Sequence, residues 1–250
     1  MESALFRPFQ RKTPVWLWLV IIALAIFNGL PFLAPVLMKL GLDWAANIVY
    51  MVYSPLCHQM AQRSFFMFGP HGFEMYNVNQ LPVDASGPLG PLILKSFTGN
   101  PQIGWKVAWS DRMVSMYGSP LLAAVAYAIA RQIRVVKPLA LWGVVLLALP
   151  MGIDGITHFL SDFAGVGHGF RDSNMWLAGL TGNLFPPSFY AGDALGSFNS
   201  IMRLLTGLLF GFGIGWLVFP YMESAGDEIA ELRQPTESGP APVNETTATT

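Results

Sequence analysis

The chain has 250 residues, of which 12% are charged and 53% hydrophobic, and its mean hydropathy is +0.45. Soluble domains contain about 25% charged residues, so we expect much of this chain to lie in lipid. Its formal net charge of -1 leaves no basic surface of the kind that binds nucleic acid. Cys57 is the only cysteine, which excludes an intramolecular disulfide.

Four apolar runs are long enough to cross a bilayer core, which requires about 20 helical residues. They cover residues 15–37, 114–133, 138–160 and 200–222. The first run is too long for a signal peptide and lacks an A-x-A cleavage site, so we interpret it as a retained anchor. The predicted fold class is all-α: a polytopic membrane bundle of about four transmembrane helices, with residues 15–222 forming a single helical membrane domain.

Basic residues at the ends of these runs predict the orientation of the protein. They cluster before the first run and between the second and third: Arg7, Arg11, Lys12, Arg131, Arg134 and Lys137. The positive-inside rule places both clusters in the cytoplasm. We therefore expect a multi-pass protein of the cell membrane with both termini cytoplasmic. Residues 1–14 would form a cytoplasmic segment and residues 223–250 a disordered cytoplasmic tail, rich in Glu, Pro, Ser and Thr.

Two long outer loops, near residues 38–113 and 161–198, contain predicted elements of their own. Residues 43–68 are predicted to form an amphipathic or partly inserted helix broken near Pro55. The Pro, Gly and Asn content of residues 69–104 favours irregular coil. Residues 173–181 suit a short helix at the membrane interface.

The notable polar side chains gather at the outer ends of the runs. Asp154, Thr157, His158 and Ser161 share one helical face because of their spacing. A charge inside a helix in lipid costs roughly 2.5–3.5 kcal/mol at the centre, so such residues usually pair. Asp154 with Arg203 is the expected ion pair. A structural polar network is expected from Gln59, Arg63, Asp111, Arg112, Asn199 and Arg203.

The same cluster contains donors for a metal ion. Asp154 and His158 lie one helical turn apart, and Cys57 and His58 would complete a mixed N, S and O shell for a divalent transition metal. Cys57 is also a candidate nucleophile, because a nearby histidine or arginine lowers a thiol pKa. The alternative is that these residues only tie helix ends together.

Gly207, Gly211 and Gly215 form a stripe of small residues along the fourth run. Such a stripe lets another helix approach closely. We expect it to pack first within the chain and second against another copy in a homodimer.

Four polar motifs follow one another along the chain. They are Cys57-His58-Gln59 with Arg63-Ser64-Phe65, Tyr117-Gly118, Ile153-Asp154-Gly155, and Arg203-Leu204-Leu205-Thr206-Gly207. Their ordered combination, over about residues 50–221, resembles the predicted prokaryotic membrane proteins grouped as domain of unknown function 2085. The resemblance implies one module and no particular activity. Relatives usually carry one or two cysteines where this chain has Trp109-Ser110-Asp111-Arg112, which weakens the metal and thiol hypotheses.

Three functions remain open from these residues, and they do not decide whether the protein is an enzyme. The first is a polar Cys/His/Asp/Arg pocket at the extracytoplasmic face that binds a metal ion or a polar headgroup, with Asp154 or His158 as candidate catalytic base. The second is a non-enzymatic accessory or assembly subunit that docks on a membrane protein partner. The third is a small transporter, which a cluster on one face disfavours. In each case the lipid bilayer is a partner.

Overall fold

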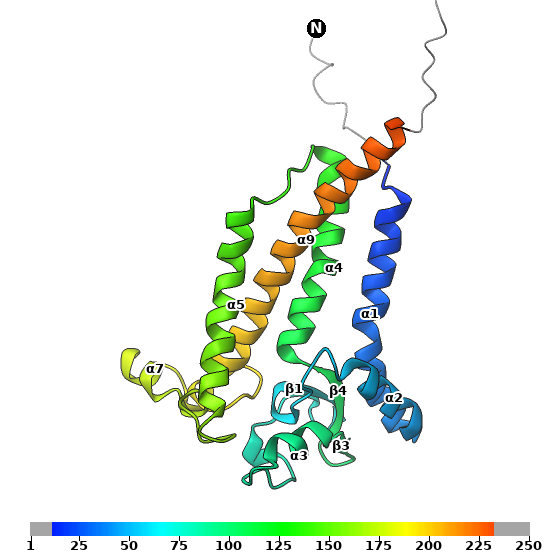
Figure 1. Ribbon diagram of the computed structural model, residues 1–250. Coiled ribbons are helices and arrows are strands. Elements are labelled where there is room, and N and C mark those ends of the chain that lie inside the picture. Colours follow the sequence, from blue (N-terminus) through cyan, green and yellow to red (C-terminus); the bar gives the residue numbers. More distant parts are fainter. Residues whose placement is uncertain (1–11, 233–250) are drawn as a thin grey trace, which may run out of the picture.

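Four helices of the computed structural model, which describes residues 12–232, are long and apolar enough to cross a membrane (Figure 1). They are α1 (Val15–Lys39), α4 (Asp111–Ile133), α5 (Leu141–Asp162) and α9 (Phe198–Leu232). Each contains most of one predicted apolar run, so the prediction of four candidate spans is confirmed. The first eleven residues, and with them most of the predicted N-terminal segment, lie outside the described part.

Helix α9 lies at the centre of the bundle, packed between α4 and α5, and α1 packs against α4 (Figure 1). The contact between α4 and α9 is close because the glycine stripe of α9 faces α4. A Cβ at Gly211 would lie 2.1 Å from the carbonyl oxygen of Met116, and one at Gly215 would lie 2.7 Å from the Cβ of Ala123. The stripe is thus covered within the chain.

Between α1 and α4, residues 43–110 form a small unit at one end of the bundle, here called the end unit (Figure 1). Its elements are α2 (Asp43–Tyr53), η1 (Ala61–Arg63), β1 (Ser64–Gly69), β2 (Gly72–Glu74), η2 (Val78–Gln80), α3 (Gly90–Ser96), β3 (Gly99–Asn100) and β4 (Gly104–Ser110). The strands form one antiparallel sheet in the order β2-β1-β4-β3.

This sheet corrects the all-α prediction and the predicted helix over residues 43–68. The helix ends at Tyr53, and the aromatic stretch Ser64–Gly69 pairs with β4 as a strand. Aromatic residues favour strands when they pack on a half-buried sheet face. The predicted irregular segment, residues 69–104, likewise contains short elements.

An aromatic cluster joins the end unit to the bundle. The ring centroid of Phe27 in α1 lies 5.6, 5.2 and 5.5 Å from those of Tyr53, Trp109 and Tyr117. The Tyr53 hydroxyl also donates to the carbonyl of Phe27 at 2.8 Å. Because β4 continues into α4 without a loop, these contacts fix the first turn of α4 relative to the sheet.

The segment between α5 and α9 folds back against the helix ends through three short helices. These are α6 (Phe170–Ser173), α7 (Met175–Leu180) and α8 (Pro187–Tyr190). Helix α7 lies within the predicted interfacial helix. At the other end of the chain, α9 continues to Leu232, so the disordered tail predicted over residues 223–250 is wrong for its first ten residues; the others lie outside the described part.

Candidate functional site

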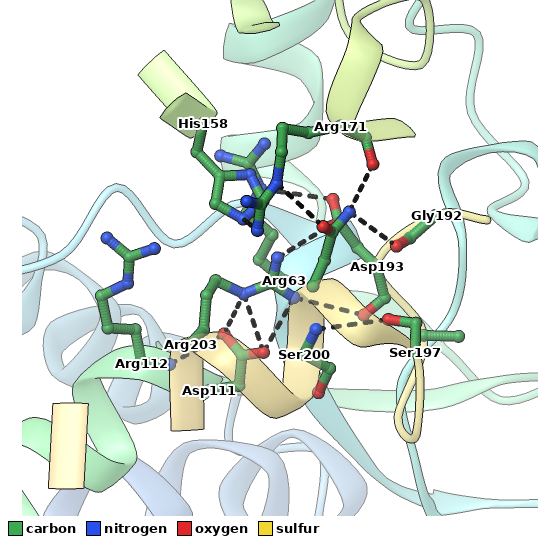
Figure 2. Close-up of polar contacts among 12 residues, drawn as sticks. Arg63, Asp111, Arg112, His158, Arg171, Gly192, Asp193, Ser197, Ser200 and Arg203 are labelled. Carbon is green, nitrogen blue, oxygen red and sulfur yellow. Dashed lines mark hydrogen bonds and ion pairs between the residues drawn. The ribbon is translucent and has the colours of Figure 1, made fainter. Parts of the chain in front are cut away.

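Eight charged side chains meet where α4, α5 and α9 join the end unit, and all of them except Asp154 and Asp162 are labelled in Figure 2. They are Arg63, Asp111, Arg112, Asp154, Asp162, Arg171, Asp193 and Arg203. Even the most exposed of these side chains, that of Asp162, is only 33% accessible. Four arginines face four aspartates, so the cluster is neutral overall. Pairing of this kind is the condition under which charges can be buried.

Arg203 stands at the centre of one half of the cluster (Figure 2). Its Nε donates to both oxygens of Asp111 at 2.8 and 2.9 Å, and its Nη1 donates to Asp193 at 2.6 Å. Arg63 donates to Asp193 and, through both terminal nitrogens, to Asp162 at 3.0 and 2.8 Å. Two arginines thus face three aspartates, which leaves this half with one excess negative charge.

Asp193 illustrates how these charges compete with burial. Burial alone would raise the pKa of its carboxyl group, but the charges of Arg203 and Arg63 favour the ionised form. The pKa of Asp193 consequently lies below its usual range. The carboxylate therefore stays ionised and holds α9 against the end unit.

Asp154 stands at the centre of the other half. One carboxylate oxygen accepts from Arg112 Nη2 at 2.6 Å, and the other accepts from Arg171 Nη2 at 2.7 Å. Arg171 is held further by Asn199, whose Oδ1 accepts from its Nε at 3.1 Å. Here two arginines share one aspartate, so this half carries one excess positive charge.

His158 contacts this positive half through its Nε2, which lies 3.2 Å from Arg171 Nη2. An arginine can only donate, so Nε2 accepts, and the neutral ring carries its proton on Nδ1. That Nδ1 is buried and has no hydrogen-bond partner among the described residues; the same holds for Arg112 Nε. A buried donor left unpaired costs about 1–3 kcal/mol. A ligand that supplied acceptors to these two donors would remove this cost.

Both residues line a cavity of about 400 Å³ between α4, α5 and the end unit. Its polar lining comes from His58, Gln59, Arg63, Ser110, Arg112, His158, Asp162 and Arg203, and its apolar lining from Met60, Pro91, Met113, Phe159 and Val166. The cavity thus combines hydrogen-bond donors next to a positive charge with an extensive apolar wall. This combination suits an anionic group attached to an apolar body.

The predicted ion pair between Asp154 and Arg203 is wrong. Asp154 gives its two oxygens to Arg112 and Arg171, while Arg203 is turned toward Asp111 and Asp193. Three members of the cluster were not expected from the sequence: Asp162, Arg171 and Asp193. One signal was available, because Arg171 is the only lysine or arginine in the outer loop at residues 161–198.

The structure gives the proposed metal site at Cys57, His58, Asp154 and His158 no support. The part of the chain that the structure describes contains no group of three or more His, Cys, Asp or Glu residues placed to hold a metal ion. Cys57 is buried apart from the cavity, where its sulfur accepts from the backbone N–H groups of Gln59 and Ser110 at 3.3 and 3.4 Å. His58 is exposed, and Asp154 is occupied by arginines.

Gln59 belongs to a different polar arrangement from the one expected for it. The side-chain amide of Gln59 donates to the backbone carbonyl of Tyr50 at 2.9 Å. The backbone carbonyl of Gln59 accepts from Lys106 Nζ, also at 2.9 Å. Lys106 is fully buried and also donates to the carbonyl of Lys95 at 2.7 Å. Burial lowers the pKa of Lys106 to about 7. Asn199, in contrast, does join the charged cluster, since it bonds both the side chain and the carbonyl of Arg171.

Comparisons with known proteins agree with a membrane location. Residues 101–217 match the model of the family DUF2085, described as predicted membrane protein, which confirms the resemblance over this segment. It contains every member of the charged cluster except Arg63. An uncharacterized protein of Methanocaldococcus jannaschii is 26% identical over 169 residues, which are 66% of this chain and 81% of the relative. No solved structure matches the chain significantly.

Proposed function

We propose that this chain, which matches a family of predicted membrane proteins over residues 101–217, binds a singly charged phosphodiester group, as in a phospholipid headgroup, in the cavity beside His158. One observation carries the proposal. His158 lines this cavity together with three arginines, and its Nδ1 is a buried donor that has no hydrogen-bond partner among the described residues.

The donors and the charge select the ligand class. Oxygen atoms of a phosphodiester would accept from His158 Nδ1 and from Arg112, and charge-assisted hydrogen bonds of this kind are roughly twice as strong as neutral ones. The charged residues that line the cavity are three arginines and one aspartate, Asp162, so a negatively charged ligand is favoured there. Asp154 acts here as a positioning residue, because both of its oxygens already orient arginines.

The apolar wall favours an amphiphile over a free ion. Phe159 lines the cavity from α5 and is 64% exposed, and Met113 lines it from α4. Both lie near the ends of membrane-spanning helices, at the level where lipid headgroups meet hydrocarbon. A phospholipid would place its phosphate against the arginines and its first carbons against these side chains.

The alternatives have less support. An assembly subunit would use the aromatic loops and the glycine stripe as docking surfaces, and α4 covers the stripe. A transporter would bind near the midplane of the bilayer, whereas the cavity lies at one end of the bundle.

A matched pair of variants at His158 tests the proposal. In His158→Gln the amide oxygen can still accept from Arg171, but the donor at the Nδ1 position is lost. In His158→Asn the amide nitrogen keeps that donor. Loss of a hydrogen bond to a charged group costs about 1.5–3 kcal/mol, so we expect His158→Gln to bind phosphatidylglycerol at least 10-fold more weakly than wild type and His158→Asn to bind it nearly as well.

Binding would be measured by native mass spectrometry of protein extracted from phosphatidylcholine nanodiscs containing phosphatidylglycerol. Preferential retention of phosphatidylglycerol by wild type is expected, since choline adds a cation. A second arm titrates inorganic phosphate; tight binding of phosphate with no lipid preference would identify a soluble anion as the source. Equal retention by wild type and folded His158→Gln would overturn the proposal, and His71→Gln, at an exposed residue, controls for the substitution itself.

A further inference from the structure

The opposite face of α5 borders a second hollow, a groove of about 690 Å³ between α5, α9 and α7. Leu146, Leu149 and Ile153 line it from α5, Phe198 and Met202 from α9, and Trp176 from α7. At 100° per residue these α5 positions point away from Gly155, His158 and Phe159, which line the headgroup cavity. The groove and the cavity are therefore separate.

Three polar side chains of the lining, those of Asp154, Thr157 and Arg171, bond to one another or to the backbone. Thr157 donates to the carbonyl of Ile153 at 2.9 Å and accepts from Arg171 at 3.3 Å, while Asp154 holds Arg171. The remaining lining is apolar. The groove thus offers a ligand mainly apolar contact.

The walls select the kind of occupant. Both α5 and α9 are candidate membrane spans, so the groove faces the hydrocarbon of the bilayer. A partner helix would need small residues for close approach, but bulky side chains such as Leu149 and Ile153 project there, 54% and 56% exposed. A thin, flexible hydrocarbon chain can pack between these projecting side chains, whereas a helix about 10–12 Å across is too wide to do so.

Aromatic rings line one end of the groove. Trp176 lies edge-on to Phe198 with ring centroids 5.9 Å apart, and the guanidinium of Arg171 lies over the Phe198 ring at 5.2 Å. Tryptophan favours the boundary between headgroups and hydrocarbon. We infer that the groove holds one acyl chain of a bilayer lipid, which lies along α5 and α9 and ends below Trp176.

Leu149→Trp, which fills the groove, tests this inference. Native mass spectrometry of protein extracted from pure phosphatidylcholine nanodiscs would count the lipids that remain bound. We expect wild type to retain one lipid that Leu149→Trp loses at least 10-fold. Leu122→Trp, at a residue of α4 that is 56% exposed outside the groove, should retain that lipid. Ile153→Phe, a smaller filling change, should give an intermediate loss if Leu149→Trp is poorly folded.

The outcomes separate this site from the headgroup cavity. His158→Gln should keep the phosphatidylcholine, so failure of the headgroup proposal leaves this inference standing. Equal lipid retention by wild type and both folded groove variants would overturn it. A dimer in nanodiscs that Leu149→Trp disrupts, without loss of lipid, would also overturn it and assign the groove to a second copy of the chain.

Discussion

Asp154 lies between the buried Arg171 and the half-buried Arg112, which would otherwise repel each other. Asp154→Asn leaves Arg112 and Arg171 with a neutral acceptor. Breaking a buried ion pair from one side costs roughly 3–5 kcal/mol. We expect a clear fall in the melting temperature of the detergent-purified protein, followed by intrinsic fluorescence. The matched change Asp84→Asn, at an exposed aspartate, should have little effect, and equal melting of the two variants would show that Asp154 is not needed for the fold.

Lys106 should make stability depend on pH. Its pKa of about 7 in the folded protein lies below the value of about 10.4 for an unfolded chain. Between these two values the unfolded chain binds more protons, so the free energy of unfolding should rise from about pH 7 to about pH 10, by at most roughly 1.4 kcal/mol per pH unit. Below pH 7 this contribution no longer changes.

Lys106→Met checks this dependence. Melting temperatures of wild type and the variant would be compared from pH 7 to 9.5, and the rise should disappear in Lys106→Met. Lys137→Met, at an exposed lysine, should keep it. A parallel pH profile for wild type and Lys106→Met would show that another group is responsible.

At the scale of elements, the contact between α4 and α9 depends on the absence of side chains at the glycine stripe. Gly211→Ala would place a Cβ 2.1 Å from the backbone oxygen of Met116, which must move the helices apart. Overpacking of this kind costs about 1–3 kcal/mol, so the melting temperature should fall. Gly152→Ala in α5, whose Cβ would meet nothing within 4 Å, serves as control and should be neutral or slightly stabilising because alanine favours helix.

For the whole molecule, four spans place the first residues of α1 and the last residues of α9 at the same end, away from the end unit (Figure 1). The basic residues between α4 and α5 predict that this shared end is cytoplasmic. The test uses His71→Cys in a Cys57→Ser background. This cysteine lies in the end unit and should react with a membrane-impermeant maleimide in intact cells. Lys137→Cys in the same background should react only after lysis. The reverse labelling pattern would show that the protein has the opposite orientation in the membrane.

The sequence by itself determined the four helices of the bundle, because lipid requires about 20 apolar residues with their backbone bonded internally. It also indicated that polar residues such as Asp154, His158 and Arg203 lie at one end, since helical spacing and span order are local properties. It did not predict the sheet, because strands as short as β2 and β3 carry too few residues to show a period.

Only the tertiary structure decided which charges meet. Asp111 and Arg203 are 92 positions apart and Arg63 and Asp193 are 130 apart, and any of four arginines could have paired with any of four aspartates. The observed pairs result from the packing of α9 against α4 and of the end unit against both helices. The cavity beside His158 is decided in the same way, because residues from separate elements enclose it.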